Sequence, residues 1–153
     1  MPTAARLTAA MCLAVLAGIL SKMIIPLMPE NTQFGYFIPI NVALGLLAGW
    51  TVMGPRASRG ITAGINNGLT GVFILMLWGL ATHSVREMLK KALLRRYDGM
   101  GEALIASISI AAEYFMVIAT LPIAITVIVG GALSGVITNL VNRRYPSDMA
   151  ALF

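Results

Sequence analysis

The feature that most constrains this chain is its series of long apolar runs. Each is about as long as the roughly 20 residues that an α-helix needs to cross a bilayer. Backbone polar groups cannot stay unpaired in lipid, so a run of this kind folds as a helix. We therefore predict an all-α integral membrane protein with four transmembrane helices, at residues 4–28, 34–53, 60–82 and 121–141.

The composition supports this class of protein. The hydrophobic fraction is 58% and the charged fraction 11%, against roughly 45–50% and about 25% in soluble domains. A soluble fold of 153 residues could not bury that much apolar surface. The net charge of +5 comes from basic residues beside the apolar runs. This placement indicates a lipid bilayer with anionic headgroups as the partner, and no nucleic acid. We treat residues 1–153 as one membrane domain.

One segment, HSVREMLKKALLRRYDG at residues 83–99, is strongly charged. At 100° per residue, its apolar residues form one continuous arc and its basic residues occupy the other side. Glu87 and Lys91 have the spacing of a helical i,i+4 ion pair. We predict a basic amphipathic helix that continues the third span along the membrane surface. The alternative is a patch that docks a partner. The lipid-headgroup patch would consist of Arg86, Lys90, Lys91, Arg95 and Arg96.

A second surface helix is predicted at residues 101–114, so that the amphipathic interfacial segment covers residues 83–118. Glu102, Ser109 and Glu113 make a narrow polar stripe on an otherwise apolar helix. The uncharged run between the two glutamates is short, and a carboxylate deep in lipid costs about 2.5–3.5 kcal/mol even on the lenient insertion scale. A fifth span over residues 101–120 remains the alternative.

Small residues at four-residue spacing occur in every proposed span, as in Ala10, Ala14 and Gly18 of the first. Such residues let helix backbones approach closely in a membrane, where lipid gives no hydrophobic reward for association. Because these stripes exceed what one four-helix bundle must use, we also predict a partner, either a second copy or a larger inner-membrane complex. The candidate packing residues in the later spans are Gly45, Gly49, Gly60, Gly64, Gly68, Gly131 and Gly135.

Polar residues inside the third and fourth spans form a second candidate site. Successive spans are antiparallel, so the polar positions of these two spans fall near the same membrane face, whereas Asn41 lies near the opposite face. Two interpretations stay open: hydrogen bonding between helices, and a site for a solute or an ion. The predicted intramembrane cluster contains Asn66, Asn67, Thr70, Ser134, Thr138 and Asn139.

Residues for catalysis are scarce. His83 is the single histidine and lies at a span end, where an interfacial histidine is the expected role. Cys12 is the single cysteine and lies inside the first apolar run. Catalytic and zinc sites usually need more than one such residue, and no phosphate-binding motif is present. We expect no enzymatic activity, no cofactor and no metal site.

The chain resembles the TrgA-type membrane proteins, which are associated with tellurite resistance in Gram-negative bacteria. The resemblance rests on MPTAARL, GLLAGWTVMG, INNGLTGV, HSVREML, RRYDG, EYF and VGGALSG, in this order along nearly the whole chain. It implies a protein of the bacterial cell inner membrane that is linked to tellurite tolerance, and it brings no catalytic residues.

Direct action on tellurite would require cations to bind the oxyanion, and no span has one at its centre. We therefore expect an indirect role, as an accessory or structural component of the membrane. The alternatives are an accessory subunit of a larger respiratory or photosynthetic complex, and a small transporter or pore.

The orientation in the membrane depends on a nearly tied count of basic residues. With cytoplasmic termini, Arg6, Arg56, Arg59, Arg143 and Arg144 lie inside, against Lys22 and the five basic residues of the 83–99 segment outside. The first helices usually dominate orientation, and the charges around the first hairpin favour cytoplasmic termini. A spanning helix at 101–114 would move the C-terminus to the other side.

Overall fold

The structure is a computed structural model that describes residues 3–30, 34–58 and 60–146. Every regular element in this part of the chain is helical, as the sequence predicts. Four of the helices are long and apolar enough to cross a membrane. The elements are α1 (Ala4–Ile24), the 3-10 helix η1 (Ile25–Leu27), α2 (Phe37–Ala48), the π-helix η2 (Gly49–Met53), α3 (Ile61–Leu93), α4 (Met100–Ile118) and α5 (Leu121–Arg144).

The four helices of spanning length are not the same four that the sequence indicated. They are α1 with η1, α3, α4 and α5, whereas α2 and η2 together form a shorter apolar helix, Phe37–Met53. The second predicted span is shorter because residues 35 and 36 form a turn before α2 begins. The helix expected at residues 101–114 is longer because it continues through Phe115 to Ile118, which gives it 19 residues.

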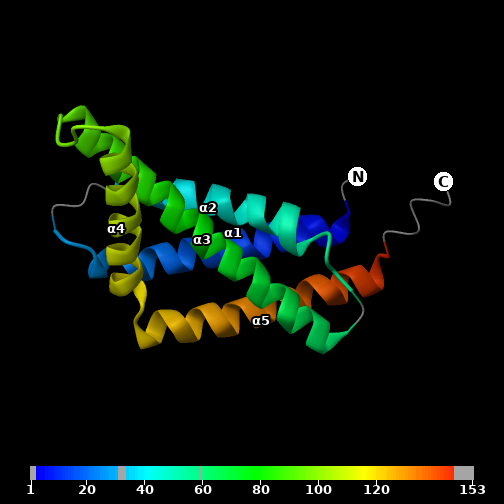
Figure 1. Ribbon diagram of the computed structural model, residues 1–153. Helices are drawn as coiled ribbons and strands as arrows, with labels where there is room; N and C mark the ends of the chain where they lie inside the picture. Colours follow the sequence, from blue (N-terminus) through cyan, green and yellow to red (C-terminus); the bar gives the residue numbers. More distant parts are fainter. Residues whose placement is uncertain (1–2, 31–33, 59, 147–153) are drawn as a thin grey trace.

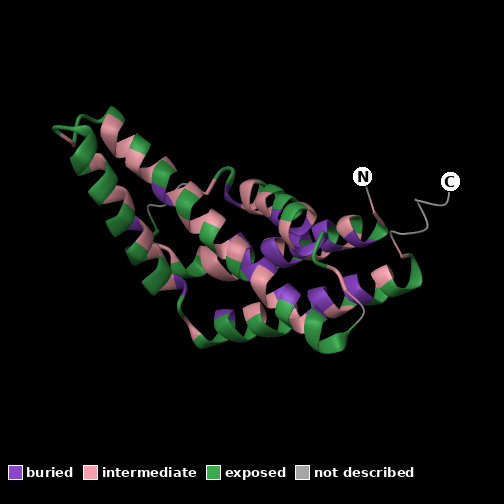
Figure 2. Ribbon diagram, turned by 45° about the vertical axis from the view of Figure 1, so that its right-hand side comes forward, coloured by how far each residue is buried: buried purple, intermediate pink, exposed green. Residues whose placement is uncertain are grey.

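The helices form a bundle with α1 at its centre. In Figure 1, α1, α2 and α5 lie roughly along one another, and α3 crosses them diagonally. The start of α1 and the end of α5 lie at one end of the bundle, while α4 lies at the other end, steeply inclined to α1 and α5. Buried residues gather where α1, α3 and α5 meet, and exposed residues cover much of α4 (Figure 2).

Helices α3 and α5 approach so closely that their glycine backbones touch. A Cβ atom on Gly68 would lie 2.8 Å from the backbone nitrogen of Gly135, and one on Gly135 would lie 2.7 Å from the Cα of Gly68. Gly64 and Gly131 take part in the same contact, because a Cβ on either would meet the backbone of the opposite helix. No side chain larger than hydrogen fits at Gly68 or Gly135 without moving the helices apart.

A second contact of this kind joins α1 and α2. A Cβ atom on Gly45 would lie 2.6 Å from the carbonyl oxygen of Leu13, and one on Gly49 would lie 2.5 Å from the Cα of Ala10. Alanines of α1 thus pack against Gly45 of α2 and Gly49 of η2. Both helix pairs use the small-residue spacing found in the sequence, so the stripes lie within one chain and need no second copy to explain them.

Gly60 does not belong to these contacts, which corrects the sequence prediction. It is the N-cap of α3, and a Cβ there would meet only Ala63 of the same helix, at 3.7 Å. Its carbonyl oxygen instead accepts a hydrogen bond of 2.8 Å from Nδ2 of Asn139. The four-residue spacing alone cannot distinguish the first glycine of a packing stripe from a glycine that only caps the start of the helix.

Helix α3 is longer than the predicted third span and includes the first part of the basic segment. It has 33 residues, which corresponds to about 50 Å, and it ends only at Leu93. The basic segment up to that residue is therefore not a separate helix. Glu87 pairs with Lys90, at 3.7 Å between Oε2 and Nζ, and not with the expected Lys91.

The end of α3 is a left-handed turn at Arg95, whose φ is 53°. The backbone N–H of Arg95 donates to the carbonyl of Ala92, and that of Arg96 donates to the carbonyl of Lys91. This pair of bonds is the Schellman pattern, which usually has glycine in the left-handed position. It reverses the chain, and α4 then packs back against α3.

Substitution of Gly68 by alanine tests the α3–α5 contact. Because the added methyl would overlap the α5 backbone, we expect the free energy of unfolding in detergent to fall by about 1–3 kcal/mol or more. Gly101→Ala is the matched control, since a Cβ there meets nothing within 4 Å and alanine is the better helix former. Equal thermal unfolding midpoints for the two variants would contradict the close packing.

Candidate functional site

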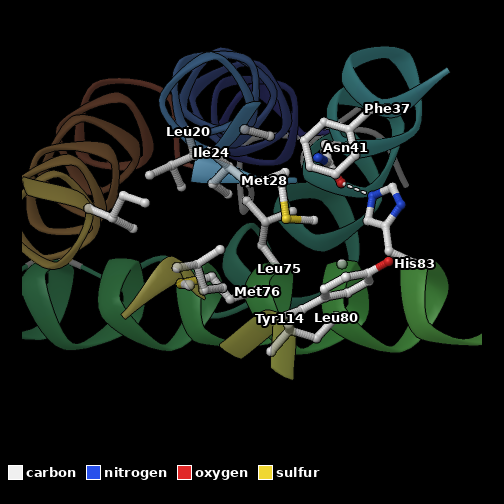
Figure 3. Close-up of a pocket in the computed structure, with 14 residues that line it drawn as sticks. Leu20, Ile24, Met28, Phe37, Asn41, Leu75, Met76, Leu80, His83 and Tyr114 are labelled. Carbon is white, nitrogen blue, oxygen red and sulfur yellow. Dashed lines mark hydrogen bonds between the residues drawn. The ribbon is translucent and has the colours of Figure 1, made fainter. Parts of the chain in front are cut away.

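A cavity of about 70 Å³ lies between the helices at the end of the bundle near α4 (Figure 3). Residues of α1, α2, α3, α4 and α5 contribute to its wall. The wall is mainly apolar, and its polar side chains are Asn41, His83 and Tyr114. The larger aliphatic side chains of the wall include Leu20, Ile24, Met28, Leu75, Leu80 and Ile118.

A chain of hydrogen bonds joins three helices at the polar side of this cavity. The hydroxyl of Ser21 donates to the carbonyl oxygen of Ala17, at 2.7 Å. Nδ2 of Asn41 donates to Oγ of Ser21, at 2.9 Å. Oδ1 of Asn41 lies 2.8 Å from Nε2 of His83. This chain ties α1 to α2 and α2 to α3, and it satisfies polar groups that lie among apolar side chains.

The direction of these bonds determines the tautomer of His83. A carbonyl oxygen can only accept, so the Ser21 hydroxyl must donate to Ala17 and accept from the Asn41 amide. The Asn41 amide oxygen can then only accept from His83, so Nε2 of His83 carries a proton. Nδ1 is left as the site where a further proton binds, and protonation there leaves the bond to Asn41 intact.

Aromatic contacts hold the imidazole in place. The rings of Phe37 and His83 have centroids 4.5 Å apart and are tilted by 34°. Phe34 meets Phe37 edge to face, with centroids 5.7 Å apart. Tyr114 of α4 lies beside His83 at the cavity wall (Figure 3). His83 is thus part of a packed, hydrogen-bonded wall, beyond the interfacial role that the sequence suggested.

The predicted cluster of Asn66, Asn67 and Thr70 with residues of α5 is not a single site. Adjacent residues on a helix point in directions 100° apart, so Asn67 is buried while Asn66 is exposed. The Thr70 hydroxyl bonds to the carbonyl of Asn66 in its own helix. Nδ2 of Asn67 donates to the carbonyl oxygen of Met53, at 2.7 Å, where η2 ends. Its Oδ1 is buried without a hydrogen-bond partner among the described residues.

The α5 members of the predicted cluster have structural contacts. Ser134 and Thr138 are buried, and the Thr138 hydroxyl donates to the carbonyl of Ser134, one turn earlier. Asn139 binds the connection between η2 and α3, because its Oδ1 accepts from the backbone N–H of Ser58, at 3.1 Å. Its Nδ2 donates to the carbonyl of Gly60, so the side chain fastens two points of that connection.

The basic patch lies where α3 leaves the bundle. Arg86, Lys90 and Lys91 are partly exposed on the last turns of α3, and Arg95 and Arg96 are exposed in the turn that follows. Cys12 is a free, partly exposed cysteine in α1. Among the described residues, no group of three or more His, Cys, Asp or Glu side chains is arranged to hold a metal ion.

Sequence reasoning did not find the pairing of Asn41 with His83. A signal for it was present, because antiparallel neighbouring helices bring the start of the second helix beside the end of the third. Asn41 lies near the start of α2, and His83 lies beyond the middle of α3. Ser21 and Tyr114 carried no such signal, since their positions depend on how α1 and α4 are rotated about their axes.

The fold and the pocket define a small all-α protein with helices of membrane-spanning length and a partly open, mainly apolar cavity that has one polar side. Comparisons with protein families, with curated proteins and with solved structures each found no match.

The tautomer of His83 can be measured directly because the chain contains one histidine. In protein labelled with ¹⁵N-histidine, we expect the neutral ring to carry its proton on Nε2. Asn41→Leu removes the acceptor and should allow the other tautomer to appear, whereas the exposed Asn66→Leu should leave the spectrum unchanged. An Nδ1–H tautomer in the unsubstituted protein would contradict the hydrogen-bond chain.

Proposed function

We propose that this chain is a multi-pass protein of the bacterial inner membrane in which α1, α2 with η2, α3 and α5 cross the bilayer. The outward faces of the helices support insertion, because they carry large apolar side chains that a water-soluble bundle would bury. On α5, Ile125, Ile128, Leu133, Ile137 and Leu140 are all exposed. Figure 2 shows exposed residues along the outside of the bundle.

The second crossing is the shortest. Phe37–Met53 has 12 residues in α2 and 5 in η2, or about 25 Å at the rise of an α-helix. This is close to the lower limit of roughly 17 residues for a span. Its packing along α1 supports the assignment, since Gly45 and Gly49, about one helical turn apart, both lie against the α1 backbone.

Helix α4 is proposed to lie at the membrane surface, although it is long enough to cross. One face, with Ile110 and Ile118, is buried in the protein. A second face exposes Leu104, Ile108 and Phe115. The polar stripe of Glu102, Ser109 and Glu113 is also exposed, on a third side. At the membrane surface the buried face would meet the protein, the exposed apolar face would meet lipid and the polar stripe would meet water. A spanning α4 would instead carry carboxylates into lipid.

The resemblance to the TrgA-type proteins supports a link to tellurite tolerance, and the placement of charges favours an indirect role. Lys22 lies near the end of α1, Arg86 lies in the part of α3 beyond the bundle, and Arg143 lies in the last turn of α5. Cations at such positions are poorly placed to carry a doubly charged oxyanion through the bundle.

The observation that carries the proposal of an indirect role is the backbone contact between α3 and α5. This contact leaves no passage between the two helices within a single chain.

A larger assembly is the second candidate. The exposed apolar face of α4 could pack against another subunit, either in a second copy of this chain or in a respiratory or photosynthetic complex. A pore would also need several copies, since Gly68 and Gly135 leave no passage between α3 and α5. The start of α1 and the end of α5 share one end of the bundle (Figure 1), so both lie on the same side of the membrane in this arrangement. We propose that this side is the cytoplasm, because the charges around the first hairpin, with Arg6 before it and Arg56 after it, favour that orientation.

Expression in a tellurite-sensitive bacterium tests the proposed role. We expect the unsubstituted chain and Asn66→Ala to raise tellurite tolerance equally, because Asn66 is exposed on the outside of α3. Gly68→Leu should abolish the effect by separating α3 from α5. Tellurite uptake per cell should be the same with and without the chain. Unchanged tolerance with the intact chain would refute the association, and changed uptake would favour a transporter.

A further inference from the structure

The face of α3 that lines the cavity continues beyond it as a charged face. Met76, Gly79 and His83 line the cavity, and positions three, four and seven residues further along a helix fall on the same side. Arg86 and Lys90 therefore follow His83 on this side of α3, toward the basic turn at Arg95. An apolar cavity, a polar wall and a cationic surface thus succeed one another along one helix.

This order matches the order of chemical groups in a phospholipid. The cavity of about 70 Å³ has room for two or three methylene groups but not for an aromatic ring, since a dry cavity that binds benzene measures about 150 Å³. The hydroxyl of Tyr114 is a hydrogen-bond donor of the kind that an ester carbonyl accepts. A guanidinium group such as Arg86 binds a phosphate through paired hydrogen bonds.

We propose that this face of α3 binds one phospholipid of the surrounding bilayer. One acyl chain enters the cavity beside Met76 and Gly79, an ester carbonyl accepts from the Tyr114 hydroxyl, and the phosphate lies against Arg86 and Lys90. The site rests on the proposed insertion of the bundle in a membrane. The cavity is partly open to the outside of the bundle, so an acyl chain can enter it from the lipid.

The charges around the site favour an anionic phospholipid over a neutral lipid or a second protein chain. The polar wall of the cavity, with Asn41, His83 and Tyr114, carries no carboxylate, so it suits the uncharged ester region. Two carboxylates lie near this surface: Glu87, whose bond to Lys90 is long at 3.7 Å, and Glu113, next to Tyr114 in α4. The basic residues at the end of α3 and in the turn after it outnumber these two, so the surface keeps a net positive charge, which favours an anionic headgroup such as that of phosphatidylglycerol. They are Arg86, Lys90, Lys91, Arg95 and Arg96.

Native mass spectrometry of the purified full chain tests the site. The protein is mixed in detergent with phosphatidylglycerol or phosphatidylcholine of identical acyl chains, and the bound lipid is counted. Gly79→Leu fills the cavity without a backbone clash, because the nearest atom to a Cβ there is Oδ1 of Asn41, at 3.7 Å. Gly101→Leu makes the same change on α4 in open space. Arg86→Gln removes the proposed phosphate contact and leaves the cavity unchanged.

We expect more phosphatidylglycerol than phosphatidylcholine on the unsubstituted chain and on Gly101→Leu. Gly79→Leu should reduce the retained lipid by more than about tenfold, which corresponds to two or three methylene groups no longer buried. Arg86→Gln should reduce phosphatidylglycerol by about tenfold, the effect of one lost charge-assisted hydrogen bond. Flotation of all four proteins with liposomes reports membrane insertion separately, so failure of the proposed topology is distinguishable from absence of the site.

Equal lipid retention by Gly79→Leu and Gly101→Leu would overturn the proposal. It would also be overturned if both lipids were retained equally and Arg86→Gln changed neither, because the phosphate would then take no part in binding.

Discussion

The contact between α3 and α5 is the interaction on which the other helices depend. Lipid offers no hydrophobic reward for helix association, so two helices stay together only where their backbones come close enough for dense packing. Gly64, Gly68, Gly131 and Gly135 provide that approach, and the same principle joins α1 to α2. Helix α1 also packs against α5, which joins the two helix pairs into one core. The position of α4 follows because its two ends are connected to α3 and α5.

Polar side chains in this bundle mainly satisfy backbone groups at places where helices are interrupted. Asn67 binds the carbonyl at the end of the π-helix, and Asn139 binds both sides of the connection into α3. A buried amide is favourable only when it is paired, so these residues fix the helix junctions in one arrangement. Asn41 and His83 act in the same way between α2 and α3, and they also give the cavity its polar side.

The apolar runs predicted the helical class, and the glycine spacing predicted close packing of the helices, because both depend on local periodicity. Which helices pair through these glycines could not be predicted from the spacing. The extent of α3 and α4 was not predictable in this way, since charged residues such as Arg86 and Glu113 end a hydropathy run without ending a helix. Asn66 and Asn67 illustrate a further limit. As neighbouring polar residues they suggested one polar cluster, but the rotation of α3 against its neighbours buries Asn67 and exposes Asn66. The pairing of Asn41 with His83 likewise depends on tertiary packing.

The central claim is that α5 crosses the bilayer while α4 lies on its surface, and nitroxide depth measurements test it most directly. Leu133 and Ser109 are both exposed and lie near the midpoints of α5 and α4. Each would be replaced by a spin-labelled cysteine in a chain with Cys12 changed to serine. The account predicts that the label at 133 meets oxygen but not a water-soluble nickel complex, and that the label at 109 meets the nickel complex. Equal, deep burial in lipid at both positions would contradict the account.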